Sequence, residues 1–197
     1  MNNFNIDNFI NSQKNSNNIN LNDFPELDLY MDQVMQVFEK RLAYTKRYET
    51  DKVLTKTMIN NYAKDNLLIN IKNKKYSKNH LILMGLIYNL KGSLSLTDIK
   101  TLLTPMVNDL NSGEDYPLYD VYQSFLDIYD SNLEELKNLS TTIQENTLNT
   151  IKSKNSSLGK YEENFLLVCA FVEMSNLFRR ISEKIIDECF ENPKEKK

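Results

Sequence analysis

The stretch that decides the fold of this chain runs from Lys52 to Leu103. After two residues it reads LTKTMINNYAKDNLL (54–68), INIKNKKYSKNH (69–80), LILMGLIYNLKGS (81–93) and LSLTDIKTLL (94–103). Apolar residues three and four positions apart in the first, third and fourth pieces predict helices, whereas the loose alternation of the second predicts a short two-stranded ribbon. The expected order is therefore helix, basic ribbon, helix and helix.

The first of these helices is expected over residues 56–64, with Thr55 as its N-cap. The Thr55 hydroxyl would accept a hydrogen bond from a backbone N–H of the first turn. Met58 and Ile59 belong to the inner face, and for this helix taken alone an ordinary solvated face explains the other residues better than DNA contact does. Lysines, however, neutralise phosphates, and an asparagine amide can pair with an adenine edge in the major groove. The outward-facing candidates for DNA contact are Lys56, Thr57, Asn60, Asn61 and Lys64.

The basic ribbon would act as a wing that lies along the phosphate backbone beside this helix. Its candidate contact residues are Lys72, Lys74, Lys75 and Tyr76. The next helix is expected from Lys78 to about Lys91, capped by Ser77 and stopped by Gly92. Ser95 and Asp98 are three apart, which is typical of a capping box at the start of a further helix.

Charge separates this middle segment from the rest of the chain. The net charge of the whole chain is -3, but residues 40–100 hold 13 basic and 4 acidic residues, and both flanks are acidic. A basic segment between acidic ones indicates an anionic partner for the middle alone, and nucleic acid is the commonest such partner. A lysine-rich solvated surface explains the same count equally well.

Outside the middle segment, the sequence predicts a disordered N-terminal segment, further helices and a polar linker. Residues 1–24 are Asn-rich and are expected to be mostly disordered. After Pro25, the spacing of Leu27, Tyr30, Val34, Phe38 and Leu42 predicts one amphipathic helix. We expect a winged-helix domain over residues 25–107, a polar linker over 108–115, and a C-terminal helical region over 116–191.

Three helices are expected in the C-terminal region. The first starts at Pro117 and carries apolar residues to Tyr129, the second covers about 132–153, and the third runs from Tyr161 to about Phe190. The third contains NFLLVCAFVEM at residues 164–174, which is apolar on nearly all sides. A helix wetted on one face does not need this, so it is expected inside a bundle or in a dimer interface.

Three motifs resemble the DNA-binding domain of the mercury-resistance-regulator (MerR) superfamily of winged-helix transcription factors. They are Tyr62 followed by Asn66-Leu67-Leu68, the wing closure Lys74-Lys75-Tyr76-Ser77, and Gly92 through Ile99. The phrases LTKTMINNYAK, KKYS and LSLTDIK are still more similar to an uncharacterised bacterial family, the domain of unknown function 1836. The resemblance covers about residues 27–125. It implies a mainly α, MerR-like winged helix-turn-helix with a small β wing, and a regulatory role.

Other classes of protein find little support. P-loop, GxGxxG, HExxH and GxSxG motifs are missing, so an enzyme is not expected and no catalytic residue is assigned. His80, the single histidine, falls in the first turn of a predicted helix, where capping or exposure is expected rather than chemistry. Two cysteines without CxxC spacing predict no metal site, and no cofactor is expected. With no apolar run of about 20 residues and no export signal, a cytoplasmic location without membrane contact is expected.

The sequence thus predicts a transcriptional regulator that binds double-stranded DNA and forms a homodimer through its C-terminal helices, without identifying an effector. The alternative is an adaptor that uses a degenerate winged-helix scaffold to bind another protein. Asn60 and Asn61 stand where the MerR superfamily usually has an arginine and a tyrosine, and this favours the adaptor.

Overall fold

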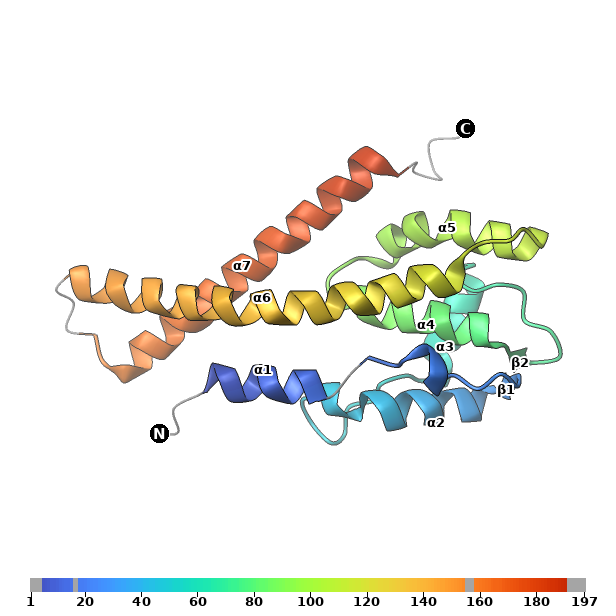
Figure 1. Ribbon diagram of the computed structural model, residues 1–197, viewed down its shortest axis with the longest axis horizontal. Helices are drawn as coiled ribbons and strands as arrows, with labels where there is room; N and C mark the ends of the chain where they lie inside the picture. The colour runs from blue at the N-terminus through green and yellow to red at the C-terminus, as the bar shows by residue number, and fades with distance from the viewer. Residues whose placement is uncertain (1–4, 16–17, 155–157, 191–197) are drawn as a thin grey trace. The chain divides into compact units, whose positions relative to one another are not determined.

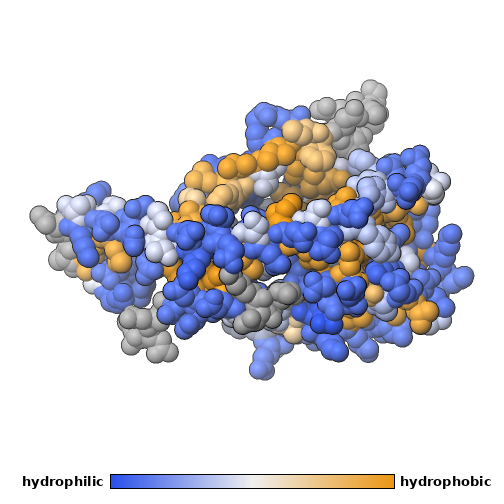
Figure 2. All heavy atoms as spheres, in the orientation of Figure 1, coloured by the Kyte–Doolittle hydropathy of each residue, from blue (hydrophilic) through white to orange (hydrophobic). Residues whose placement is uncertain are grey.

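The computed structural model of the chain describes residues 5–15, 18–154 and 158–190 (Figure 1 and Figure 2). These residues are mainly helical and contain a small two-stranded sheet, which confirms the expected mainly α class. Two compact units divide the chain. The central unit comprises Ser16–Asp127 and Ile185–Lys197, and the terminal unit comprises Met1–Asn15 and Ile128–Lys184. The boundary lies inside a helix, not in the polar stretch at residues 108–115.

The central unit is built around α4 (Lys78–Leu90), because every side chain from Leu81 to Ile87 is buried. Figure 1 shows α4 between α5 and α2. An apolar helix surrounded in this way has no wetted face, which explains its continuous run of large apolar residues. The other elements of this unit are η1 (Leu21–Asp23), β1 (Leu29–Tyr30), α2 (Met31–Leu42), η2 (Ala43–Thr45), α3 (Lys56–Lys64), β2 (Lys75–Tyr76), α5 (Leu96–Ser112) and the start of α6 (Leu118–Ser153).

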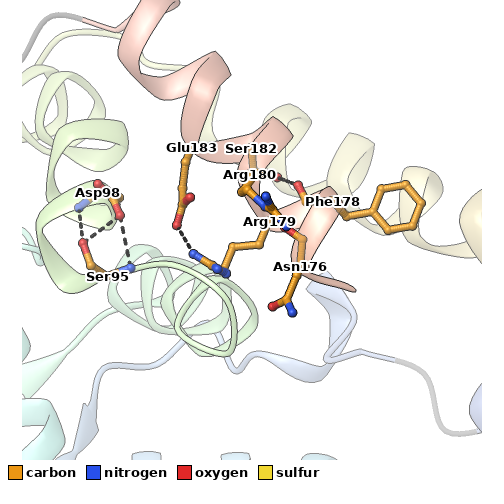
Figure 3. A network of polar contacts seen from close by, with 8 residues as sticks. All are labelled: Ser95, Asp98, Asn176, Phe178, Arg179, Arg180, Ser182 and Glu183. Atoms are coloured by element: carbon orange, nitrogen blue, oxygen red, sulfur yellow. Dashed lines mark hydrogen bonds and ion pairs between the residues drawn. The ribbon is translucent and has the colours of Figure 1, made fainter. Parts of the chain in front are cut away.

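Side-chain caps fix where the helices of this unit begin. The Asp98 N–H donates to Ser95 Oγ at 3.1 Å, and the Ser95 N–H donates to Asp98 Oδ2 at 3.2 Å, so the predicted capping box is present (Figure 3). Helix α5 continues to Ser112 and ends at Gly113, whose φ of 82° is in the left-handed region. The expected linker at residues 108–115 is therefore helical in its first part.

The N-terminal residues differ from the expectation of disorder. Ile19 and Phe24 are each no more than 2% exposed and belong to the core of the central unit. The buried Tyr122 hydroxyl donates to the Ile19 carbonyl oxygen at 2.7 Å. Residues 6–15 form a helix, and residues 1–4 and 16–17 lie outside the described residues. The Asn-rich composition predicts disorder, but the burial of scattered apolar residues orders this part of the chain.

Helix α2 also starts later than its apolar spacing predicts. Leu27 is 79% exposed and Tyr30 is 55% exposed, and the backbone between them leads into β1. The helix buries Val34, Phe38 and Leu42, which are four residues apart and therefore share one face.

The terminal unit consists of α1 (Ile6–Asn15), the later part of α6 and α7 (Lys160–Cys189) up to Lys184. Asp7 of α1 forms an ion pair with Lys137 of α6 at 3.2 Å, and within α7 Arg179 pairs with Glu183 at 2.5 Å (Figure 3). The two helices expected over residues 117–153 are one continuous helix. No described helix is both long and apolar enough to cross a membrane.

Candidate nucleic-acid interface

Helix α3 has the length and the two faces that the sequence predicts. Thr55 Oγ1 accepts a hydrogen bond from the Met58 N–H at 3.2 Å, as expected of the N-cap. Ile59 and Tyr62 are buried, with exposures of 0% and 3%. This burial anchors α3 in the core and turns its other side to solvent. The exposed side chains are those of Lys56, Thr57, Asn60, Asn61 and Lys64.

The end of α3 is equally well fixed. The Leu67 N–H donates to the Tyr62 carbonyl at 2.9 Å, and the Asn66 N–H donates to the Ala63 carbonyl at 3.2 Å. These two bonds form a Schellman motif, which places Asn66 at φ 56°. Leu67 is buried directly after it. The outer face of α3 is therefore held by a cap at one end and a buried turn at the other.

A tight turn carries the next group of lysines. The Lys75 N–H donates to the Lys72 carbonyl at 2.9 Å, and Asn73 and Lys74 both have positive φ angles, 53° and 57°. Positive φ at both central residues defines a type I′ turn, the commonest connection of a two-residue hairpin. Lys72 and Lys74 are exposed on this turn.

The pairing of the ribbon differs from a self-contained hairpin. Beyond a single bridge between Lys72 and Lys75, β2 pairs antiparallel with β1, with Leu29 opposite Tyr76 and Tyr30 opposite Lys75. Lys75 is half-buried, and its Nζ lies 5.4 Å from the centre of the Tyr30 ring. The wing is thus tied to the segment before α2, and Lys75 is held against an aromatic ring.

Tyr76 does not belong to the exposed surface, contrary to the sequence prediction. Its side chain is 4% exposed, and burial raises its pKa. The ring stands edge-on to His80, with centroids 5.6 Å apart. A strand of two residues is too short for the alternation of side chains to predict which of them is buried. Tyr76 lies in the core because β2 pairs with β1. The remaining ring surface is too small for a phosphate contact.

His80 holds the junction between β2 and α4. Its Nδ1 accepts the Ser77 backbone N–H at 3.0 Å and lies 2.8 Å from Ser77 Oγ, so the predicted capping role is present. The ring is 3% exposed, and its Nε2 is buried without a hydrogen-bond partner. Burial lowers the pKa of His80, against the opposing effects of the Ile69 backbone and Asp28. Burial of His80 was not predicted from the sequence.

An acidic side chain reaches the first lysine of the candidate surface. Asp32 Oδ1 of α2 lies 2.8 Å from Lys56 Nζ, although both side chains are about two-thirds exposed. Nearby, Glu39 pairs with Lys46, and the hydrogen bond from Lys46 lowers the Glu39 pKa. Asp32 and Glu39 line one side of an open groove of about 580 Å³ that also reaches Lys56. Lysines are therefore exposed both on α3 and on the turn, and the groove beside Lys56 has acidic residues of α2 in its lining.

The family model of the domain of unknown function DUF1836 matches residues 19–125, more than half of the chain. No curated protein and no solved structure matches the chain at a significant level. The matched residues coincide closely with the central unit, which includes Ile19 and Phe24 in its core.

Proposed function

The chain belongs to the DUF1836 family, and from this premise we propose that it is a DNA-binding transcriptional regulator of the MerR-like winged helix-turn-helix type. In this proposal α3 enters the major groove and the Lys72–Lys75 turn lies on phosphates. The observation that carries the proposal is the outer face of α3, where two lysines and two asparagines are exposed on a helix whose opposite face is buried.

The asparagines and the lysines of α3 are suited to different contacts with DNA. Asn60 and Asn61 each carry one acceptor and two donor hydrogens, which match the N6 and N7 edge of adenine. Lys56 and Lys64, at the two ends of the same helix, offer only donors and a positive charge, which suits phosphate oxygens. The asparagines are accordingly assigned to sequence reading and the lysines to positioning.

The turn adds a fixed electrostatic contact. Its type I′ geometry and the pairing of β2 with β1 hold Lys72 and Lys74 on one short, ordered projection. Neutralisation of about four phosphates by Lys56, Lys64, Lys72 and Lys74 would give a salt slope, d log K/d log[salt], of roughly -3.6. Binding should therefore weaken by about two orders of magnitude between 50 and 200 mM salt.

Fluorescence anisotropy with a labelled random duplex tests the electrostatic part. Lys72→Gln combined with Lys74→Asn should reduce the salt slope by roughly two, because two phosphate contacts are lost. Asn is chosen at Lys74 because it tolerates the left-handed backbone there. Lys152→Gln, on an exposed site of α6, is the matched control and should leave the slope unchanged. A flat salt response of the unmodified protein would refute the proposal.

Base reading requires a separate comparison. A duplex selected from a random pool should lose about 1–3 kcal/mol of its advantage over random duplex when Asn60 or Asn61 is replaced by Ala. The lysine variants should instead weaken binding to both duplexes alike. Equal losses on both duplexes in the asparagine variants would show that α3 does not read sequence.

The alternative proposal is a protein-binding adaptor, and one observation favours it. Leu27, just before β1, and Tyr30, within β1, are exposed, and Asp32 at the start of α2 pairs with Lys56. An apolar and acidic border suits a protein partner better than a phosphate backbone. Absence of any duplex binding at low salt, with an intact fold by circular dichroism, would select this alternative.

A further inference from the structure

We propose that α7 pairs antiparallel with α7 of a second copy of this chain through four residues on its outer side. These residues, Tyr161, Phe165, Val168 and Val172, are here called the α7 stripe. Their side chains are 70%, 57%, 61% and 52% exposed, although all four are large and uncharged. The inference concerns the terminal unit and does not depend on DNA binding.

The α7 stripe lies on the side of the helix that α6 does not cover. Glu163 and Leu167 of α7 line a hollow of about 280 Å³ together with Thr147 and Leu148 of α6. At about 100° per residue, these two positions of α7 are separated from the stripe by roughly half a turn. The first half of α7 thus has one side against α6 and a second, apolar side in solvent.

The spacing of the stripe selects a helix as its partner. Its members are separated by four, three and four residues, the alternation with which side chains of one helix pack into the gaps of another. The four positions of the stripe span about three turns, and none of them carries a charge. A flat or irregular surface would not require such a repeat.

The sizes of the four side chains select a second copy in the antiparallel direction. The two aromatic residues, Tyr161 and Phe165, come first, and the two valines come last. Antiparallel pairing about the midpoint between Phe165 and Val168 sets each aromatic ring against a valine of the other copy. Facing positions that alternate large and small residues fill space efficiently. Parallel pairing would set ring against ring and leave the valines with gaps.

The exposed area agrees with this assignment. Fully exposed aromatic side chains present roughly 150–250 Å², so four large side chains at these exposures contribute on the order of 400 Å² per copy. Two copies would bury about 800 Å² of these side chains alone, and their flanking atoms bring the contact to the roughly 1,000 Å² expected of a specific interface. An apolar patch of roughly 400 Å² is comparable with the largest patch on a typical monomer, and such a patch often serves as an interaction site.

Sedimentation equilibrium of the full chain tests the pairing. At ~50 µM the unmodified protein should have twice the 23.1 kDa mass of one chain, because this concentration is well above a dissociation constant of about 1 µM. Val168→Lys should raise the dissociation constant at least about tenfold, because it places an unpaired charge against Phe165. Asn149→Lys adds the same charge to an exposed site of α6 and should leave the mass unchanged. Circular dichroism checks that both variants remain helical.

A crosslinking experiment tests the direction of pairing. With Cys169 and Cys189 replaced by Ser, a mixture of Phe165→Cys and Val168→Cys chains should form mixed disulfides faster than either variant does alone. Faster crosslinking of Phe165→Cys with itself would overturn the antiparallel arrangement. The α7 stripe would be overturned as the interface if the unmodified protein were monomeric at ~50 µM, or if Val168→Lys left the dissociation constant of the dimer unchanged.

Discussion

Substitution of Gly85 tests how α4 and α6 pack in the central unit. An alanine Cβ at this position would lie 3.0 Å from Tyr122 Oη, and the next nearest atoms are Tyr122 Cε2 at 3.4 Å and Cζ at 3.5 Å. Tyr122 is 1% exposed, and its ring is 5.8 Å from that of Phe24. Its hydroxyl cannot move aside without losing its hydrogen bond to the Ile19 carbonyl.

The magnitudes follow from these contacts. Gly85→Ala gains about 1 kcal/mol of helix propensity but loses roughly 1–3 kcal/mol through overpacking, for a net loss of about 1 kcal/mol. Tyr122→Phe leaves the buried Ile19 carbonyl without its donor and should cost ~1–3 kcal/mol. The double variant should lose about 1–2 kcal/mol less than the sum, because the atom that the alanine meets is the one removed.

Urea unfolding followed by circular dichroism at 222 nm measures this cycle, since the chain has no tryptophan. Gly92→Ala serves as the control, because an added Cβ there meets only the Asn89 carbonyl oxygen at 3.9 Å. That variant should change the unfolding free energy by less than about 0.5 kcal/mol. Additive losses at Gly85 and Tyr122, within about 0.5 kcal/mol, would refute the close approach of α4 to Tyr122.

Two further predictions concern the charged groups. Because burial lowers the pKa of His80, the unfolded chain binds more protons, so the unfolding free energy should fall as the pH drops from about 6.5 toward the native pKa. His80→Gln retains an acceptor for the Ser77 N–H and should remove this part of the pH dependence of the unfolding free energy. A urea midpoint that depends on pH in the same way in His80→Gln as in the unmodified protein would contradict this prediction. Asp32→Asn should raise the affinity for random duplex about two- to fivefold by releasing Lys56, whereas Glu145→Gln should not; a lower affinity in Asp32→Asn would contradict the role of α3.

Local signals in the sequence predicted much of the central unit. Thr55, Ser95 and Asp98 mark helix starts through side chains that bond to nearby backbone, so their effect is contained within four residues. The outer face of α3 follows from apolar spacing alone. The structure places Asn66 at a positive φ, a conformation that Asn tolerates better than most residues.

Contacts between distant residues account for what the sequence did not predict. The order of Ile19 depends on Tyr122, which is 103 residues away, and no local pattern reveals that bond. Likewise, the burial of Tyr76 follows from the pairing of β2 with β1, two strands of only two residues each. The polar residues Asp130 and Ser131 suggest a break, but α6 continues through them without a glycine or proline to end it.

Chemical-shift mapping on the ¹⁵N-labelled full chain tests the central claim most directly. On addition of a random duplex at low salt, we predict shifts in the side-chain amides of Asn60 and Asn61 and in the backbone amides of the Lys72–Lys75 turn. These shifts should disappear as salt is added, because the phosphate contacts are electrostatic. Shifts confined to the terminal unit, or no shifts at any salt concentration, would contradict the assignment of α3 and the turn as a DNA-binding surface.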